Sequence, residues 1–434
     1  MHEPTEQKMK SLPSYSNTTI PLRAVFNESI LQVTEQKTVQ ARLRLTYQHE
    51  GQSEIVEKTV SVTVQSRNAI KWKDKRRLAA FIEPRNSQII DYTKAIDGLF
   101  RDQPTYDLPT NVATALQTFT VLTNGGYTYS VDPQTDFSVV SRDPSMLDYC
   151  QYPEQTIRRK AGDCDDLVTL YLSMLANAGV STGYVDIPGH VMSAFDAGLS
   201  PDDLDGSALS RDDVVVDQDK VWIPVETTLL GTESFLTAWE KGIERYRKEQ
   251  KEGNLPQIIS ISKARSVYEP SSIQPDTFQV PEPDTSAILA EYEDQASTLY
   301  ARRNEAQRQR LNKQLAADPE NAYVRNRLGI LYTRGGQYQE ANALYEKGLE
   351  LTPNNALLLN NYANVLYHQE RYEKAIDLYK RSLTRGEEDP QVYINLCKAQ
   401  LAAGRATEAS SSFQTAIQKD PSLSDTYSYL QKQL

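Results

Sequence analysis

The sequence is poor in cysteine and histidine, which limits the kinds of site it can build. Its 434 residues include four histidines and three cysteines, and the cysteines lie far apart, at positions 150, 164 and 397. Three widely separated cysteines make neither a disulfide framework nor a zinc knuckle. The chain also lacks HExxH, P-loop and GxGxxG motifs, so neither metalloprotease nor nucleotide chemistry has support.

Basic residues and long apolar runs are scarce as well. The formal net charge is −11, and because nucleic-acid binding needs a concentrated basic surface, we expect no nucleic-acid partner. No run approaches the roughly 18 apolar residues that cross a bilayer, so we expect no transmembrane segment. The polar start, residues 1–10, lacks an apolar signal core. We slightly favour an exported, periplasmic protein whose signal is absent from this chain over a cytoplasmic one.

The first 80 residues predict a small β module. Residues 1–18 are polar, and we expect them to be disordered. Apolar and polar residues alternate from Val39 to Tyr47 and, less strictly, from Ile55 to Val64, with a turn at 49–52 between them. This pattern predicts antiparallel strands within a β-sandwich-like module over residues 19–80.

Beyond residue 86 the apolar period becomes helical and then mixed. Helical stripes over 89–99 and 110–122 precede a stretch of alternating helix and strand signals, so we expect an α+β domain over residues 86–248. Residues 250–286 are rich in Pro, Ser, Gln and Asp, which is typical of a linker, placed here at 249–287. Everything after residue 287 predicts helix.

A strict 34-residue repeat occupies the C-terminal part, in units 322–355, 356–389 and 390–423. Position 20 of each unit is alanine and position 24 is aromatic, which lets two helices cross closely while a ring fills the gap between them. These residues are Ala341, Ala375, Ala409, Tyr345, Tyr379 and Phe413, and proline follows at 353 and 421.

This repeat resembles the tetratricopeptide repeat family. The resemblance implies an all-α solenoid over residues 288–434 that binds a protein partner on its concave face. Pro319 lies one period before Pro353, so residues 311–317 are expected to be the second helix of a degenerate leading repeat. Residues 424–434 are expected to form a capping helix.

Cys164 lies where a buried helix is predicted to begin. Asp163 can cap that helix with Asp166 as its partner, which puts the thiol at the first helical position. The positive end of the helix favours the thiolate, whereas the nearby charges of Asp165 and Asp166 raise the pKa of the thiol. An active Cys164 therefore needs an imidazole partner. A buried bystander cysteine is the alternative interpretation.

The same region offers one histidine and one carboxylate for that role. His190 is the only histidine between residues 50 and 367, and it begins a predicted strand after the turn at Pro188 and Gly189. Glu226 ends another short strand that begins at Val221. Taken singly, each is more often a structural or solvent-facing residue. Together with Cys164 they fit a nucleophile, a base and a group that orients the base.

The sequence GDCDD at 162–166, the His-led strand and the segment WIPVETT at 222–228 resemble the transglutaminase-like cysteine peptidase superfamily. The resemblance implies a papain-like α+β core with Cys164 as nucleophile, His190 as general base and acid, and Glu226 in place of the more usual Asp. It also places an oxyanion donor ahead of the nucleophile helix. The usual Trp is missing there, and Gln151 or Tyr152 takes its position.

An acidic loop separates the His and Glu strands. Its segment 202–212 loosely echoes a calcium-binding loop, although Pro201 occupies the first ligand position and cannot ligate through its side chain. We therefore expect no cofactor, and a solvated insertion is favoured over a calcium site.

These observations predict a multidomain α+β protein with two open functions. The first is thiol-dependent acyl transfer on a protein or peptide amide, with hydrolysis favoured over cross-linking, as in the many bacterial-looking members of the resembled superfamily described as proteases. The second is an adaptor in which the transglutaminase-like domain is structural and the repeats bind a partner. A glycan-linked amidase, which the same superfamily includes, has no specific support.

Overall fold

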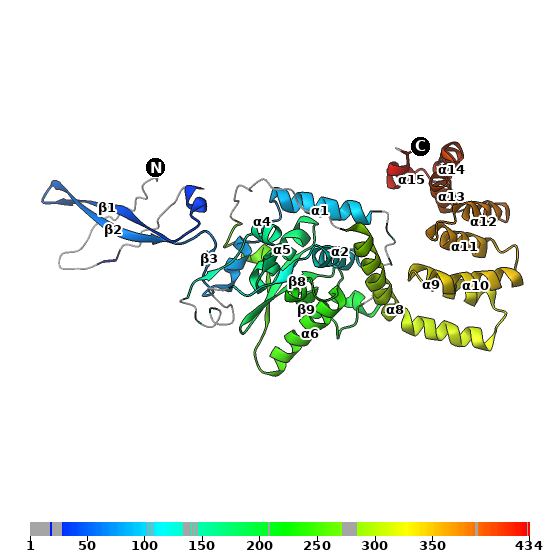
Figure 1. The fold of residues 1–434 in the computed structure, drawn as a ribbon, viewed down its shortest axis with the longest axis horizontal. Helices are drawn as coiled ribbons and strands as arrows, with labels where there is room; N and C mark the ends of the chain where they lie inside the picture. Colours follow the sequence, from blue (N-terminus) through cyan, green and yellow to red (C-terminus); the bar gives the residue numbers. More distant parts are fainter. Residues whose placement is uncertain are drawn as a thin grey trace. The chain divides into compact units, whose positions relative to one another are not determined.

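Figure 1 shows the computed structural model of the chain, in which two compact units each gather several stretches of sequence. The first contains Met1–Asp97, Val121–Asp196 and Trp222–Pro283, and the second Gly98–Thr120, Ala197–Val221 and Asp284–Leu434. The structure describes residues 18–19, 28–101, 103, 106, 108–132, 140, 143, 146–206, 209–270, 284–386, 389–431 and 433–434. The predicted disordered segment 1–18 therefore lies outside the described residues except for residue 18.

The N-terminal β module is a long hairpin. Strands β1 (Lys37–His49) and β2 (Gln52–Val64) pair antiparallel along their whole length (Figure 1). Glu50 and Gly51 form the turn with φ values of 51° and 75°, as tight hairpin turns require.

One face of the hairpin is apolar but uncovered in the part of the chain that the structure describes. Leu45 and Val56 lie opposite each other and remain 53% and 51% exposed. The two strands form a sheet by themselves, so the predicted sandwich is wrong for these residues. Alternation fixes which side chains share a face, but it does not specify what packs against that face.

An antiparallel sheet in the next part of the chain carries two of the candidate residues, with His190 at the start of one strand and Glu226 directly after another. Its strands run in the order β11-β7-β8-β10-β9. Their bounds are Thr182–Ile187 for β7, His190–Asp196 for β8, Val215–Asp217 for β9, Lys220–Val225 for β10 and Gln257–Ser260 for β11. β7 and β8 form a hairpin whose turn uses Gly189 at φ 74°. The strands predicted around His190 and before Glu226 are confirmed.

Helix α5 (Cys164–Asn177) is buried on all sides from Cys164 to Leu175 and lies at the core of this α+β region. A helix that is apolar all round belongs in an interior, and Gly179 ends this one at φ 87°. The other elements are η1 (Glu28–Gln32), β3 (Ala69–Ile70), η2 (Lys75–Ala80), α1 (Ser87–Phe100), α2 (Thr110–Asn124), β4 (Thr128–Tyr129), β5 (Asp148–Tyr149), α4 (Pro153–Arg159), β6 (Ala161–Gly162), η3 (Pro201–Gly206), η4 (Thr227–Leu229), α6 (Phe235–Lys251) and α7 (Ile261–Ala264).

The predicted linker at 249–287 starts too early. Strand β11 pairs with β7, with Ile258 opposite Val185, and α7 follows it at once. Two consecutive isoleucines provide this edge strand, but the surrounding Pro, Ser and Gln residues mask the short apolar signal. Residues 271–283 of the predicted linker lie outside the described part of the chain.

The C-terminal helices follow the predicted repeat. The three units begin at Ala322, Ala356 and Pro390, where helices α9, α11 and α13 begin. The position-20 alanines are fully buried and the position-24 aromatics are at most 3% exposed. The helices are α9 (Ala322–Arg334), α10 (Tyr338–Leu351), α11 (Ala356–His368), α12 (Tyr372–Thr384), α13 (Pro390–Ala402) and α14 (Ala406–Lys419).

Both ends of the array differ from the prediction. Residues 311–317 end a continuous helix, α8 (Thr285–Ala317), rather than forming a short helix of their own. The predicted capping helix 424–434 contains two single turns, α15 (Leu423–Thr426) and α16 (Ser428–Gln431). The 34-residue period predicts the helices inside the array better than those at its ends, because a terminal helix has a neighbouring repeat on one side only. Among the described residues, no helix combines the length and apolarity needed to cross a bilayer.

The unit that holds the repeats also includes parts of the predicted domain 86–248. Tyr292 of α8 packs against Phe100 and Tyr106, with ring centroids 4.7 and 6.2 Å apart. A Cβ atom at Gly336, in the turn of the first repeat, would lie 2.9 Å from the Tyr106 ring. These aromatic contacts join residues distant in sequence, so a pass along the chain could not divide it this way.

We predict that Gly329→Ala destabilises the repeat array. A Cβ atom there would lie 2.6 Å from Cζ of Tyr345. Overpacking costs about 1–3 kcal/mol, partly offset by the roughly 1 kcal/mol that alanine gains over glycine in a helix. Urea unfolding followed by far-UV circular dichroism should show a lower midpoint for the helical transition. The matched control is Gly98→Ala in α1, where a Cβ meets nothing within 4 Å. An equal midpoint for both variants would contradict the packing described here.

Candidate functional site

Helix α5 begins at Cys164, and its first turn supplies its own hydrogen-bond partners. The Asp163 carboxylate accepts from the backbone N–H of Asp166 at 3.5 Å, and the Asp166 carboxylate accepts from the Asp163 N–H at 3.3 Å. This reciprocal pair is the capping box that the sequence predicts. Cys164 therefore occupies the first helical position, at the partial positive charge of the helix end.

The two residues predicted as oxyanion donors have other partners. Gln151 donates its backbone N–H to Asp166 at 2.6 Å, and its side-chain amide donates to the same carboxylate and to the Ala161 carbonyl. Tyr152 directs its hydroxyl to the Arg67 carbonyl at 3.4 Å. Gln151 therefore fixes the start of α5, a role that its position in the sequence did not reveal.

The Cys164 thiol is buried, with only 2% of the residue exposed. Burial raises the pKa of the thiol well above its ordinary value, and the charges of Asp165 and Asp163 raise it further. The backbone N–H of Val191 hydrogen-bonds to the sulfur and acts in the opposite direction. This contact places the sulfur beside β8, but among the described interactions the thiol forms no hydrogen bond with the His190 ring, so the structure pairs His190 with Glu226 and not with Cys164.

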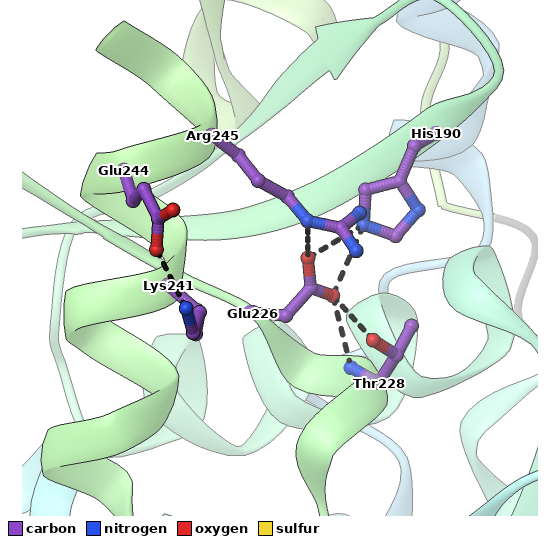
Figure 2. Close-up of polar contacts among 6 residues, drawn as sticks. All are labelled: His190, Glu226, Thr228, Lys241, Glu244 and Arg245. Atoms are coloured by element: carbon purple, nitrogen blue, oxygen red, sulfur yellow. Dashed lines mark hydrogen bonds and ion pairs between the residues drawn. The ribbon is translucent and has the colours of Figure 1, made fainter. Parts of the chain in front are cut away.

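His190 and Glu226 are brought together across the sheet. The two strands pair with Val225 opposite Ser193, and Glu226 follows directly after β10. His190 Nε2 lies 3.0 Å from Oε1 of Glu226 and 2.8 Å from Oε2 (Figure 2). The histidine side chain is 13% exposed and the glutamate side chain 2%. A buried carboxylate held this closely can fix the orientation of an imidazole ring.

Two further side chains hold the Glu226 carboxylate. Thr228 donates its hydroxyl to Oε1 at 2.6 Å and its backbone N–H at 3.3 Å, while Arg245 Nε lies 3.2 Å from Oε2 (Figure 2). Burial raises the pKa of Glu226, but His190, Thr228 and Arg245 together lower it below its ordinary value. The segment at 222–228 included Thr228, whereas Arg245 carried no signal because helix α6 joins the site only in the fold.

A cavity of about 580 Å³ opens next to the start of α5. Gly162, two residues before Cys164, lines it together with Gln151 and Asp166. Further wall residues are Ser130, Asp132, Asp148, Tyr149 and Arg159. Polar and apolar surface contribute about equally to the lining, which carries both signs of charge, and none of Cys164, His190 and Glu226 belongs to it.

Potential metal ligands gather at the helix start rather than in the acidic loop. Among the described residues, the ligand atoms of Cys150, Asp165 and Asp166, and those of Asp163, Cys164 and Asp165, each lie within 4.8 Å of one another. Asp166 already accepts three hydrogen bonds there. In the loop predicted as a weak calcium candidate, the Asp203 carboxylate accepts from Ser200 at 2.6 Å, and residues 207–208 lie outside the description.

The first helices of the repeats share a second surface. Asparagine side chains link successive units, with Asn361 donating to Asn326 at 2.9 Å and Asn395 to Asn364 at 3.2 Å. Tyr323 and Leu357, each at the second position of its unit, are 68% and 55% exposed. Exposed aromatic and aliphatic side chains beside polar amides are typical of protein-binding surfaces.

The C-terminal part of the chain consists of tetratricopeptide repeats. Three overlapping stretches, 299–356, 326–391 and 366–434, match the tetratricopeptide repeat family. Type IV pilus assembly protein PilF of Pseudomonas aeruginosa is 30% identical over 112 residues, which is 25% of this chain and 43% of that protein. Stress-induced-phosphoprotein 1 of Caenorhabditis elegans is 26% identical over 116 residues, 25% of this chain and 36% of that protein. The chain thus spans less than half of either relative.

Solved structures give matches of similar extent. MamA 41-end from Desulfovibrio magneticus RS-1 is 22% identical, with 30% of this chain and 76% of that chain covered and a TM-score of 0.27. A second MamA crystal structure is 20% identical over 30% of this chain and 71% of its own, with a TM-score of 0.25.

We predict that Gln151→Leu destabilises the first unit by about 1–3 kcal/mol, because the buried Asp166 carboxylate loses the side-chain amide donor while it keeps the backbone N–H of residue 151. Burial raises the pKa of Asp166 to about 7, so the folded state keeps a proton that the unfolded chain loses above about pH 4. Stability therefore falls as pH rises from about 4 to about 7. Loss of the Gln151 amide raises the pKa of Asp166 further, so in the variant stability continues to fall at higher pH.

The deficit of Gln151→Leu, measured by urea unfolding, should thus be larger at pH 8 than at pH 5. Gln257→Leu on the exposed side of β11 is the matched control and should change little. A deficit that does not depend on pH would contradict the role given to Gln151.

Proposed function

We propose that the chain catalyses thiol-dependent acyl transfer on a protein or peptide amide, with Cys164 as nucleophile, His190 as general base and acid, and Glu226 as the group that orients the imidazole. The observation that carries this proposal is the pairing of His190 Nε2 with the buried Glu226 carboxylate at 2.8 Å. It is supported by the hydrogen bond from Val191, the residue after His190, to the Cys164 sulfur.

The proposed mechanism depends on which ring nitrogen of His190 is bonded to Glu226. Because Nε2 faces Glu226, Nδ1 is the nitrogen to which we assign the proton of the Cys164 thiol, and the ring must approach the thiol for that transfer. The sulfur attacks the amide carbonyl carbon, and the imidazolium then returns the proton to the leaving amine as the carbon–nitrogen bond breaks. Water, deprotonated by the same nitrogen, attacks the thioester and releases an acid and the free thiol.

The electrostatics of the thiol make the histidine necessary. Burial and the charges of Asp165 and Asp163 keep Cys164 protonated, so the thiolate must form during the attack rather than before it. This arrangement supports a general-base role for His190 over a preformed ion pair. The transglutaminase-like resemblance leads to the same assignment.

The cavity beside Gly162, two residues before Cys164, is where we place the polypeptide substrate. An extended chain lying there would pass next to the first turn of α5, where backbone N–H groups and the helix end can stabilise a developing oxyanion. Hydrolysis is favoured over cross-linking, because water can reach the intermediate without a second binding site.

The repeats indicate a protein–protein interaction, and we propose that they recruit the substrate protein or tether the enzyme through the surface formed by the first helix of each repeat. The alternative is an adaptor in which the domain holding Cys164 is structural. The burial of that thiol favours this alternative, since a substrate must reach a residue that is 2% exposed. An exported location remains part of the proposal.

Thiol reactivity separates the two functions. We predict that iodoacetamide at pH 7.5 alkylates Cys164 at least about tenfold faster than Cys397, where burial raises the thiol pKa to about 11 and where no base is proposed to assist. Peptide mass spectrometry of the full chain measures both rates in one sample.

Two variants test whether the reactivity depends on the proposed partners. His190→Ala should remove the advantage of Cys164 and leave the Cys397 rate unchanged, and Glu226→Gln should reduce the advantage. If the wild-type chain modifies Cys164 no faster than Cys397, the enzyme proposal fails and the adaptor is favoured.

A further inference from the structure

Helix α6 supplies a cation to the buried carboxylate of the candidate site. Arg245 is 47% exposed, yet its Nε lies 3.2 Å from Oε2 of Glu226, whose side chain is only 2% exposed (Figure 2). The guanidinium therefore extends from the surface of α6 and forms an ion pair with the Glu226 carboxylate, which has almost no contact with solvent. An ordinary surface ion pair joins two exposed partners and contributes little.

Each oxygen of Glu226 has its own partners. Oε1 accepts from the hydroxyl and N–H of Thr228, and Oε2 forms an ion pair with Arg245, while His190 Nε2 lies within 3.0 Å of both oxygens. Thr228 and Arg245 therefore fix the carboxylate from two sides, and the imidazole bonds to the remaining edge. These are the groups that hydrogen-bond or pair with the Glu226 carboxylate in the described structure, and they come from β8, η4 and α6.

The length of the Glu226 side chain explains why its carboxylate needs several partners. Compared with aspartate, Glu226 has one more rotatable bond, so its carboxylate needs more restraint to hold an imidazole in one orientation. We infer that Arg245 is a positioning residue for the proposed Cys164–His190–Glu226 site, which holds the Glu226 carboxylate by an ion pair so that the His190 ring stays in one orientation. This inference rests on the proposed function.

The same helix offers a control. Lys241 pairs with Glu244 at 2.7 Å, and their side chains are 54% and 66% exposed (Figure 2). This cation lies one turn before Arg245, forms its ion pair on the surface and makes no contact with Glu226 that the structure describes. Removing it changes the charge of α6 by the same amount without touching the carboxylate.

The test is the pH profile of Cys164 alkylation in the full chain, with Cys397 as internal standard. In Arg245→Met we expect a fall of roughly three- to tenfold at pH 7, as for the loss of one partly exposed charge contact. Without the cation, the site binds a proton more readily, so the acid limb of the profile should move up by about half a pH unit.

Two further variants separate charge from geometry. Arg245→Lys keeps the charge but loses the planar donor group, so it should restore the acid limb and only part of the rate. Lys241→Met should match the wild type in both. A circular dichroism melt of each variant checks that the fold is intact, and Arg245→Lys serves as the test if Arg245→Met does not fold.

The outcomes distinguish the two proposals. If Cys164 is selectively reactive and Arg245→Met behaves like Lys241→Met, the positioning role is overturned and the proposed function stands. If wild-type Cys164 reacts no faster than Cys397, the proposed function fails and takes this inference with it.

Discussion

The first turn of helix α5 is buried, so its backbone N–H groups depend on protein side chains for hydrogen-bond partners. Backbone N–H groups at a helix start have no intrahelical acceptors, and leaving them unpaired in an interior is costly. Asp163 and Asp166 satisfy them reciprocally, and Gln151 satisfies the remaining demands of Asp166. This set of contacts fixes Cys164 at the helix start, where the backbone N–H of Val191 in β8 reaches its sulfur. The rest of the candidate site depends on that placement.

The burial of Cys164 also explains why the proposed site needs His190 and Glu226. A thiol that burial and neighbouring acids keep protonated can act only beside a base, and a base is useful only if its ring is held still. We propose His190, at the start of β8, as that base, and Glu226, after the end of β10, holds its ring by a hydrogen bond of 2.8 Å. Glu226 is itself a buried charge, which pairs with the cation of Arg245 and accepts two hydrogen bonds from Thr228. The packing of the C-terminal repeats depends on a buried alanine and a buried aromatic ring that recur in each of the three units.

Much of this could be predicted because the signals were local. The run GDCDD before an apolar helix, the turn at Pro188 and Gly189, and the 34-residue period each specify their element within a short window. The misplaced features depend on distant partners. Nothing near β1 and β2 says what covers their apolar face, and Gln151 looks like a donor for substrate until the fold brings Asp166 against it. Arg245 was invisible because it lies 19 residues after Glu226 on a helix whose orientation no period encodes.

The central claim is that Cys164 forms an acyl intermediate, and its most direct test is covalent capture. The full chain would be mixed with p-nitrophenyl acetate, quenched in acid within seconds, and analysed by peptide mass spectrometry. The account predicts a burst of close to one equivalent of p-nitrophenol, with acetyl on Cys164 and no burst in Cys164→Ser. Acetylation spread over lysines or over Cys150 and Cys397, with no burst, would contradict it and leave the repeats as the functional part of the chain.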